Sequence, residues 1–89
     1  MSERRLVADV RAGPGGVMTD EVGVVTGELT VAAEELPDGG VAVTVQYAGA
    51  EEWYTVTGSP VPARPEGLAA VHEEMLARVR RGGGATVRG

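Results

Sequence analysis

The segment from Pro65 to Gly82 constrains the fold more than any other part of the chain, because its periodicity, its ends and its charge order agree. At 100° per residue, its large apolar side chains share one arc of about 140° with His72, while Glu73 and Ala77 point the other way. These apolar residues are Leu68, Val71, Met75, Leu76 and Val79. The pattern predicts a helix with one buried face, which a sheet or a partner must cover.

The two ends of this segment carry helix signals of their own. Pro65 suits the first turn of a helix, and Glu66 suits its positive end. Arg78, Arg80 and Arg81 suit the negative end, Glu74 lies four residues before Arg78, and Gly82 is a stop signal.

Alternating apolar residues before this helix predict strands over Val22–Leu36, Val41–Ala48 and Glu52–Thr57. A straight strand over the first range would be about 50 Å long, so we expect a bend or bulge at Gly23 or Gly27. In the second range Val41, Val43, Val45 and Tyr47 are expected to face inward. The turn signals Pro37-Asp38-Gly39 and Gly49-Ala50-Glu51 make antiparallel neighbours of these strands.

Residues 2–11 fit either a strand or a short helix that Ser2 would cap, and the alternation of Leu6, Ala8 and Val10 favours the strand. The predicted fold is therefore α+β: an antiparallel meander of three or four strands with one C-terminal helix packed on one face. We expect residues 1–82 to form a single domain and residues 83–89 to form a flexible Gly/Arg tail. The Gly13–Gly16 run is likewise expected to be a flexible loop or hinge.

Composition limits both the core and the class of partner. Fifteen Val and twelve Ala stand against five Leu, no Ile and no Phe, so the core is poor in large side chains, and a second copy of the chain could supply more burial. The net charge of −5 argues against a general nucleic-acid binder or an anionic-membrane binder. The absence of Lys, Asn, Ile and Phe indicates a GC-rich bacterial genome, and no run of 18 apolar residues occurs, so the expected location is the cytoplasm.

The chain offers few groups for catalysis. It has no Cys, no Lys, one His and two Ser that have no base nearby in the sequence, so the usual pairs of nucleophile and base cannot be assembled. His72 lies within the apolar arc of the helix and reads best as a packed histidine bonded to the backbone or to water. We therefore expect no enzyme activity, no cofactor and no metal site.

Three sets of residues remain as candidates for binding. Trp53 and its neighbours Tyr54 and Thr55 could form a contact surface on the sheet, because one of two adjacent aromatic rings must face away from the helix. Arg78, Arg80 and Arg81 could contact an anion. His72 with Tyr47 could line a small-ligand pocket between helix and sheet.

These observations favour a small non-enzymatic interaction or accessory module that self-associates through its sheet, as a homodimer, or binds another protein. The alternatives are a nucleic-acid-associated regulator that uses its arginine-rich termini, and a small-ligand-binding domain.

Overall fold

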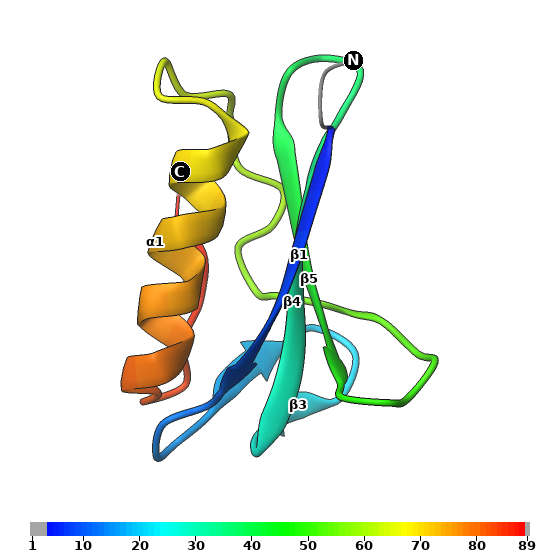
Figure 1. The fold of residues 1–89 in the computed structure, drawn as a ribbon, viewed down its shortest axis with the longest axis vertical. Coiled ribbons are helices and arrows are strands. Elements are labelled where there is room, and N and C mark those ends of the chain that lie inside the picture. The colour runs from blue at the N-terminus through cyan, green and yellow to red at the C-terminus, as the bar shows by residue number, and fades with distance from the viewer. Residues whose placement is uncertain (1–3, 89) are drawn as a thin grey trace.

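The fold is a four-stranded antiparallel sheet with one helix packed on it (Figure 1). The computed structural model describes residues 4–88. In chain order its elements are β1 (Arg5–Arg11), β2 (Val17–Thr19), β3 (Gly23–Val25), β4 (Glu28–Glu35), β5 (Val41–Tyr47), β6 (Tyr54–Thr55) and α1 (Leu68–Arg81). The large sheet has the order β1-β4-β5-β6, so the α+β class, the antiparallel sheet and the helix on one face are confirmed. Residues 5–11 form the strand that the alternation favoured, while Ser2 lies outside the described residues.

A second, two-stranded sheet of β2 and β3 was not predicted. Its strands have three residues each, too few for an alternation to stand out in the sequence. The predicted strand over Val22–Leu36 is divided between the two sheets, because the chain leaves β3 after Val25 and enters β4 at Glu28. The expected break therefore lies at Gly27.

The core lies between the helix and the large sheet and consists mostly of valines (Figure 1). From α1 it receives Val71, Met75, Leu76 and Val79, which were all predicted to face inward, and Leu68 packs against it partly buried. Strands β4 and β5 supply Leu29, Val31, Ala33, Val41, Val43 and Val45. Tyr47, expected to face inward, is instead exposed at the last residue of β5, although its neighbour in β4, Leu29, is buried.

The helix begins three residues later than predicted. Gly67, with φ 89°, precedes the first helical residue, and its N–H closes a turn onto the carbonyl of Arg64 at 3.0 Å. A helix cannot pass through a residue of positive φ, so Pro65 and Glu66 lie before α1, and its first turn has no acidic residue. At the other end Gly82 stops the helix as expected, and its N–H donates to the carbonyls of Arg78 and Val79.

The expectation of a flexible tail after residue 82 is corrected by the packing of residues 83–88. Ala85 and Val87 are buried in the core. The N–H groups of Gly83, Gly84 and Ala85 donate to the carbonyls of residues 14, 15 and 16, at 2.7 to 3.0 Å. The Gly13–Gly16 run, expected to be a hinge, therefore serves as the hydrogen-bonding partner of this C-terminal segment. Gly89 lies outside the described residues.

Candidate interaction surfaces

Strand β1 forms an open edge of the large sheet. The carbonyl of Arg4 accepts the N–H of Glu35 at 2.7 Å, and the N–H of Ala12 donates to the carbonyl of Gly27 at 2.9 Å. These two hydrogen bonds lie at the two ends of the pairing with β4, and both involve even-numbered residues. Because hydrogen-bonded positions alternate along an antiparallel strand, the even-numbered residues of β1 bond to β4, and the odd-numbered ones direct their N–H and C=O groups outward. The outward residues are Arg5, Val7, Asp9 and Arg11. Within residues 4–88 no further strand pairs with this edge.

The opposite edge of the sheet is covered. The carbonyl of Thr55 in β6 accepts the N–H of Asp20 at 3.0 Å. The Glu21 carboxylate accepts both the N–H and the hydroxyl of Thr55, each at 2.8 Å. These hydrogen bonds lower the pKa of Glu21, because they favour its charged form. Thr55, one of the three predicted contact residues, is thus bonded within the molecule.

The side chains of Arg5 and Trp53 span the face of the sheet that carries no helix. The guanidinium carbon of Arg5 lies 4.9 Å from the ring centroid of Trp53, a cation–π contact. Since β4 and β5 lie between β1 and β6, this contact crosses above the two central strands. Ala32 of β4, placed on this face by its register with Val7, is only 1% exposed. Trp53 is itself partly buried.

Tyr54 points the other way, as the alternation of adjacent strand residues requires. Its ring packs against the core, and its hydroxyl donates to the carboxylate of Glu52 at 3.3 Å. Partial burial and the nearby negative charge of Glu52 raise the pKa of Tyr54. The expectation that one of the two rings faces the helix and the other faces away is confirmed.

His72 is a core residue of α1. It is 6% exposed, and its Nε2 lies 3.1 Å from the carbonyl oxygen of Val31 in β4. The backbone bond expected for a packed histidine is present. Tyr47 is 43% exposed, and neither Tyr47 nor His72 lines the two cavities described below. Residues 4–88 also contain no group of three or more histidines and carboxylates placed to hold a metal ion.

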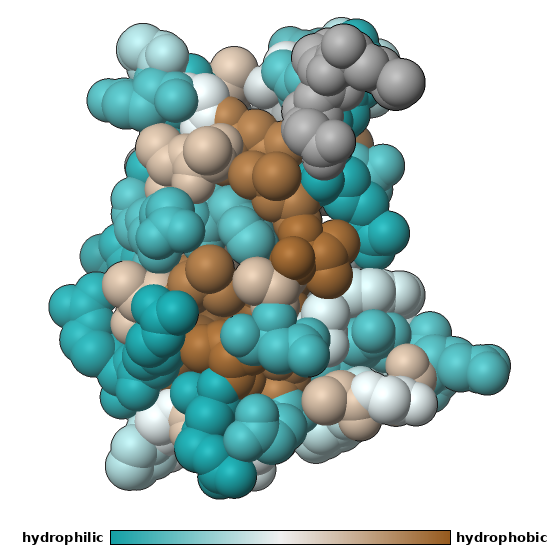
Figure 2. Space-filling model, viewed as in Figure 1, coloured by the Kyte–Doolittle hydropathy of each residue, from teal (hydrophilic) through white to brown (hydrophobic). Residues whose placement is uncertain are grey.

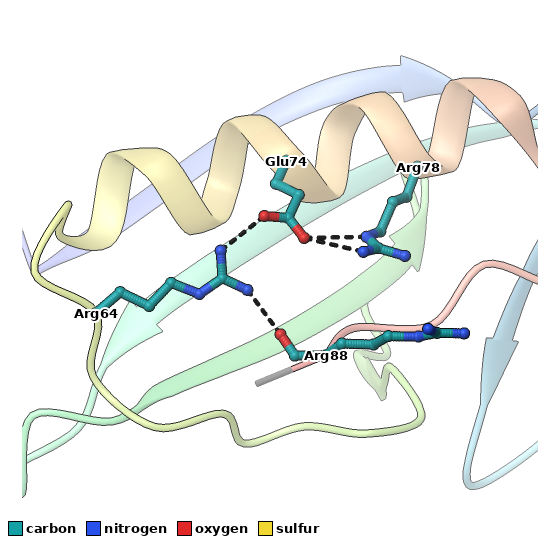
Figure 3. Close-up of polar contacts among 4 residues, drawn as sticks. All are labelled: Arg64, Glu74, Arg78 and Arg88. Atoms are coloured by element: carbon teal, nitrogen blue, oxygen red, sulfur yellow. Dashed lines mark hydrogen bonds and ion pairs between the residues drawn. The ribbon is translucent and has the colours of Figure 1, made fainter.

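A charged network ties the proline-rich connector that precedes α1 (residues 59–65) to the helix and to the C-terminal segment (Figure 3). The carboxylate of Glu74 accepts a hydrogen bond from Nη1 of Arg64 at 2.6 Å. It also accepts hydrogen bonds from Nε and Nη2 of Arg78 at 3.2 and 3.0 Å. Nη2 of Arg64 donates to the carbonyl of Arg88 at 2.7 Å. The hydrogen bonds from Arg64 and Arg78 lower the pKa of Glu74. The pair of Glu74 and Arg78 was predicted from its spacing, whereas the role of Arg64 was not.

Beside this network lies a cavity of about 340 Å³. The residues that line it are Arg78, Arg81, Gly82, Gly83, Gly84, Ala85, Thr86 and Arg88. Two of the three arginines predicted for an anion contact, Arg78 and Arg81, thus come together, and Arg88 joins them from the segment that was expected to be loose. Arg80 is not among the lining residues, because a helical step of 100° turns it away from Arg81.

A second cavity, of about 390 Å³, lies between the turn after β4 and the connector before α1. Its lining is Leu36, Asp38, Gly40, Pro60, Val61, Pro62 and Ala63. No candidate residue from the sequence belongs to it.

Comparison with protein-family models, with curated proteins and with solved structures finds no match to this chain. In the part of the chain that the structure describes, no helix has the length and apolar character needed to cross a membrane.

Proposed function

We propose that the protein is a non-enzymatic interaction module of the bacterial cytoplasm that self-associates edge to edge through β1. The observation that carries this proposal is the row of outward N–H and C=O groups at Arg5, Val7, Asp9 and Arg11. Such a row is a template for pairing with another strand. In Figure 1 the sheet is seen edge-on with β1 nearest the viewer, and Figure 2 has a band of hydrophobic residues down the middle of the same side.

A two-fold axis through Val7 gives the best register for such pairing. Two copies of β1 that meet antiparallel across this axis pair Val7 with Val7 and Arg5 with Asp9 of the second copy, twice. A shift of the axis to Ala8 would pair Arg5 with Arg11, and a shift to Asp9 would pair Asp9 with itself. The charges of β1 therefore oppose those two registers and complement each other in the first one.

The outward residues of this edge present their side chains on the helix-free face. There Asp9 accepts a hydrogen bond from the hydroxyl of Thr30 at 2.7 Å. The guanidinium of Arg5 contacts Trp53 within the same copy, so it must leave that ring to pair with Asp9 of a second copy. Val7 is 50% exposed, so its pairing with a second Val7 would remove apolar surface from water. The four strands of each copy would then form one continuous sheet across the dimer.

Charge reversal tests the register. Asp9→Arg replaces two attractive cross-strand pairs with two repulsive ones. At roughly 0.5 kcal/mol for each attraction lost and the same for each repulsion gained, the loss is about 2 kcal/mol, a dimer about 30-fold weaker. The double variant Arg5→Glu/Asp9→Arg restores opposite charges in this register and should recover most of the affinity. Sedimentation velocity across a micromolar dilution series measures both variants against the native protein.

Backbone pairing is tested at the axis itself. Val7→Pro removes an N–H that makes no bond to β4, so the monomer should fold, whereas the dimer loses its two central hydrogen bonds. Val7→Thr keeps the N–H and serves as the matched control. A native protein that stays monomeric at high micromolar concentration contradicts self-association, and so does a Val7→Pro protein that dimerises as well as Val7→Thr. If the double variant Arg5→Glu/Asp9→Arg does not recover the dimer affinity, this result contradicts the proposed register but not self-association through β1.

A further inference from the structure

We propose that the arginine-lined cavity at the end of α1 binds a small ligand that carries a phosphate group. The cavity is lined by three arginines, Arg78, Arg81 and Arg88, and no carboxylate among residues 4–88 belongs to its lining. The planar fork of a guanidinium matches the oxygens of a phosphate, and several such forks around one cavity give both charge and geometry. No residue of β1 takes part, so this site does not depend on self-association.

The charge of this corner is opposite to that of the whole chain. Three arginines, Arg78, Arg81 and Arg88, line the cavity, and Glu74 is paired with Arg78, which gives these four residues together a charge of +2. Because the chain as a whole carries −5, all other residues together carry −7. Such segregation concentrates an anion at the cavity and repels it from the remaining surface.

The arginines differ in how fully they are engaged. Both oxygens of Glu74 are taken by Arg64 and Arg78, which holds the guanidinium of Arg78 at the cavity wall. Among the described residues, the side chains of Arg81 and Arg88 have no ion-pair partner. These two arginines are therefore the groups that an incoming anion would neutralise.

The backbone around the cavity limits what else can contribute. The N–H groups of Gly82, Gly83, Gly84 and Ala85 all donate to carbonyls within the protein, so they cannot form a phosphate-binding loop. The hydroxyl of Thr86 is the other polar side chain of the lining. The N–H of Gly82 also satisfies the carbonyls of Arg78 and Val79 in the last turn of α1, acceptors that would otherwise repel an anion.

The size and lining of the cavity point to a small ligand. Its volume of about 340 Å³ is at the low end for small-ligand sites. No aromatic side chain is among its lining residues, so the aromatic platforms on which nucleobases usually stack are absent from this lining. Recognition would rest on charge, which suits a phosphorylated metabolite better than a nucleic acid.

Titration with inorganic phosphate, followed by two-dimensional NMR of the ¹⁵N-labelled protein, tests this site. We expect saturable shifts at Gly83, Gly84 and Thr86 at millimolar phosphate, and a loss of affinity of about tenfold or more in Arg81→Ala/Arg88→Ala. Arg80→Ala is the matched control, because it removes the same charge from the same turn but not from the cavity, and it should change the affinity less than about twofold.

Three outcomes would overturn the proposal. The first is the absence of saturable shifts at these residues in about 10 mM phosphate. The second is an equal loss of affinity in Arg80→Ala, which would indicate a diffuse charge effect. The third is a single-stranded oligonucleotide that binds with a steep salt dependence and loses affinity equally with every arginine removed, which would make the surface a nucleic-acid contact instead.

Discussion

The C-terminal segment should contribute to stability as a core element does, and Val87→Ala measures this. Val87 is 5% exposed and packs in the main core, and its N–H donates to the carbonyl of Thr57 at 3.1 Å. The substitution removes two buried methyl-sized groups, worth about 0.8 kcal/mol each, and leaves a small cavity, so the free energy of unfolding should fall by about 2 kcal/mol. For a domain of this size the melting temperature should fall by about 10 °C.

Val24→Ala is the matched control, because it makes the same chemical change at a residue that is 48% exposed in the β2–β3 hairpin. It should cost less than about 1 kcal/mol. Urea unfolding followed by the fluorescence of Trp53, the one tryptophan, gives both free energies under identical conditions. Equal losses of unfolding free energy in the two variants would refute the packing argument and would indicate that residues 83–88 form a flexible tail.

Two further predictions concern charge and backbone. Because the pKa of Glu74 is lowered in the folded state, its ion pairs stabilise the protein above the ordinary pKa of a glutamate, and this stability is lost as the pH falls through the lowered value. Glu74→Gln should therefore be less stable at neutral pH and lose less stability on acidification, whereas Glu73→Gln, at the exposed neighbouring position, should keep the native pH profile in acid-denaturation curves. Gly58→Ala should destabilise the fold far more than Gly49→Ala, because both residues have positive φ but only at Gly58 would the added methyl group press on the carbonyl of Val87. The strain alone costs about 1 to 2 kcal/mol, and thermal melts that give equal losses for the two variants would contradict the close approach.

The helix and the central strands could be predicted because their side chains follow a period. The stripe from Leu68 to Val79 and the alternation from Val41 to Val45 both mark one buried face, and both faces are buried in the structure. The start of the helix could not be read in the same way. Pro65 and Glu66 are good first-turn residues, yet the positive φ of Gly67 separates them from α1.

The C-terminal segment was predicted to be flexible but is packed, because glycine is found both in flexible segments and where two backbones lie close together. The run Gly82–Gly84 has the composition of a flexible tail, but glycines also let two backbones approach closely. Here a side chain at Gly82 would collide with the backbone of residues 13 and 14. A second glycine-rich run at residues 13–16 was the available signal, since two such runs can pack against each other. The convergence of Arg81 and Arg88 on one cavity follows from that pairing and has no signal of its own in the sequence.

The parallel bridge between Val17 and Ala85 has a consequence for how the protein is made. The two residues are 68 positions apart, so the ribosome must release almost the whole chain before this part of the core can close. Until then β2 has no neighbour on that side, and the nascent chain exposes Val17 to chaperones and to other nascent chains. A fragment that stops before residue 85 should therefore be a substrate for proteases, and a purification tag is better placed after a spacer than directly behind Val87.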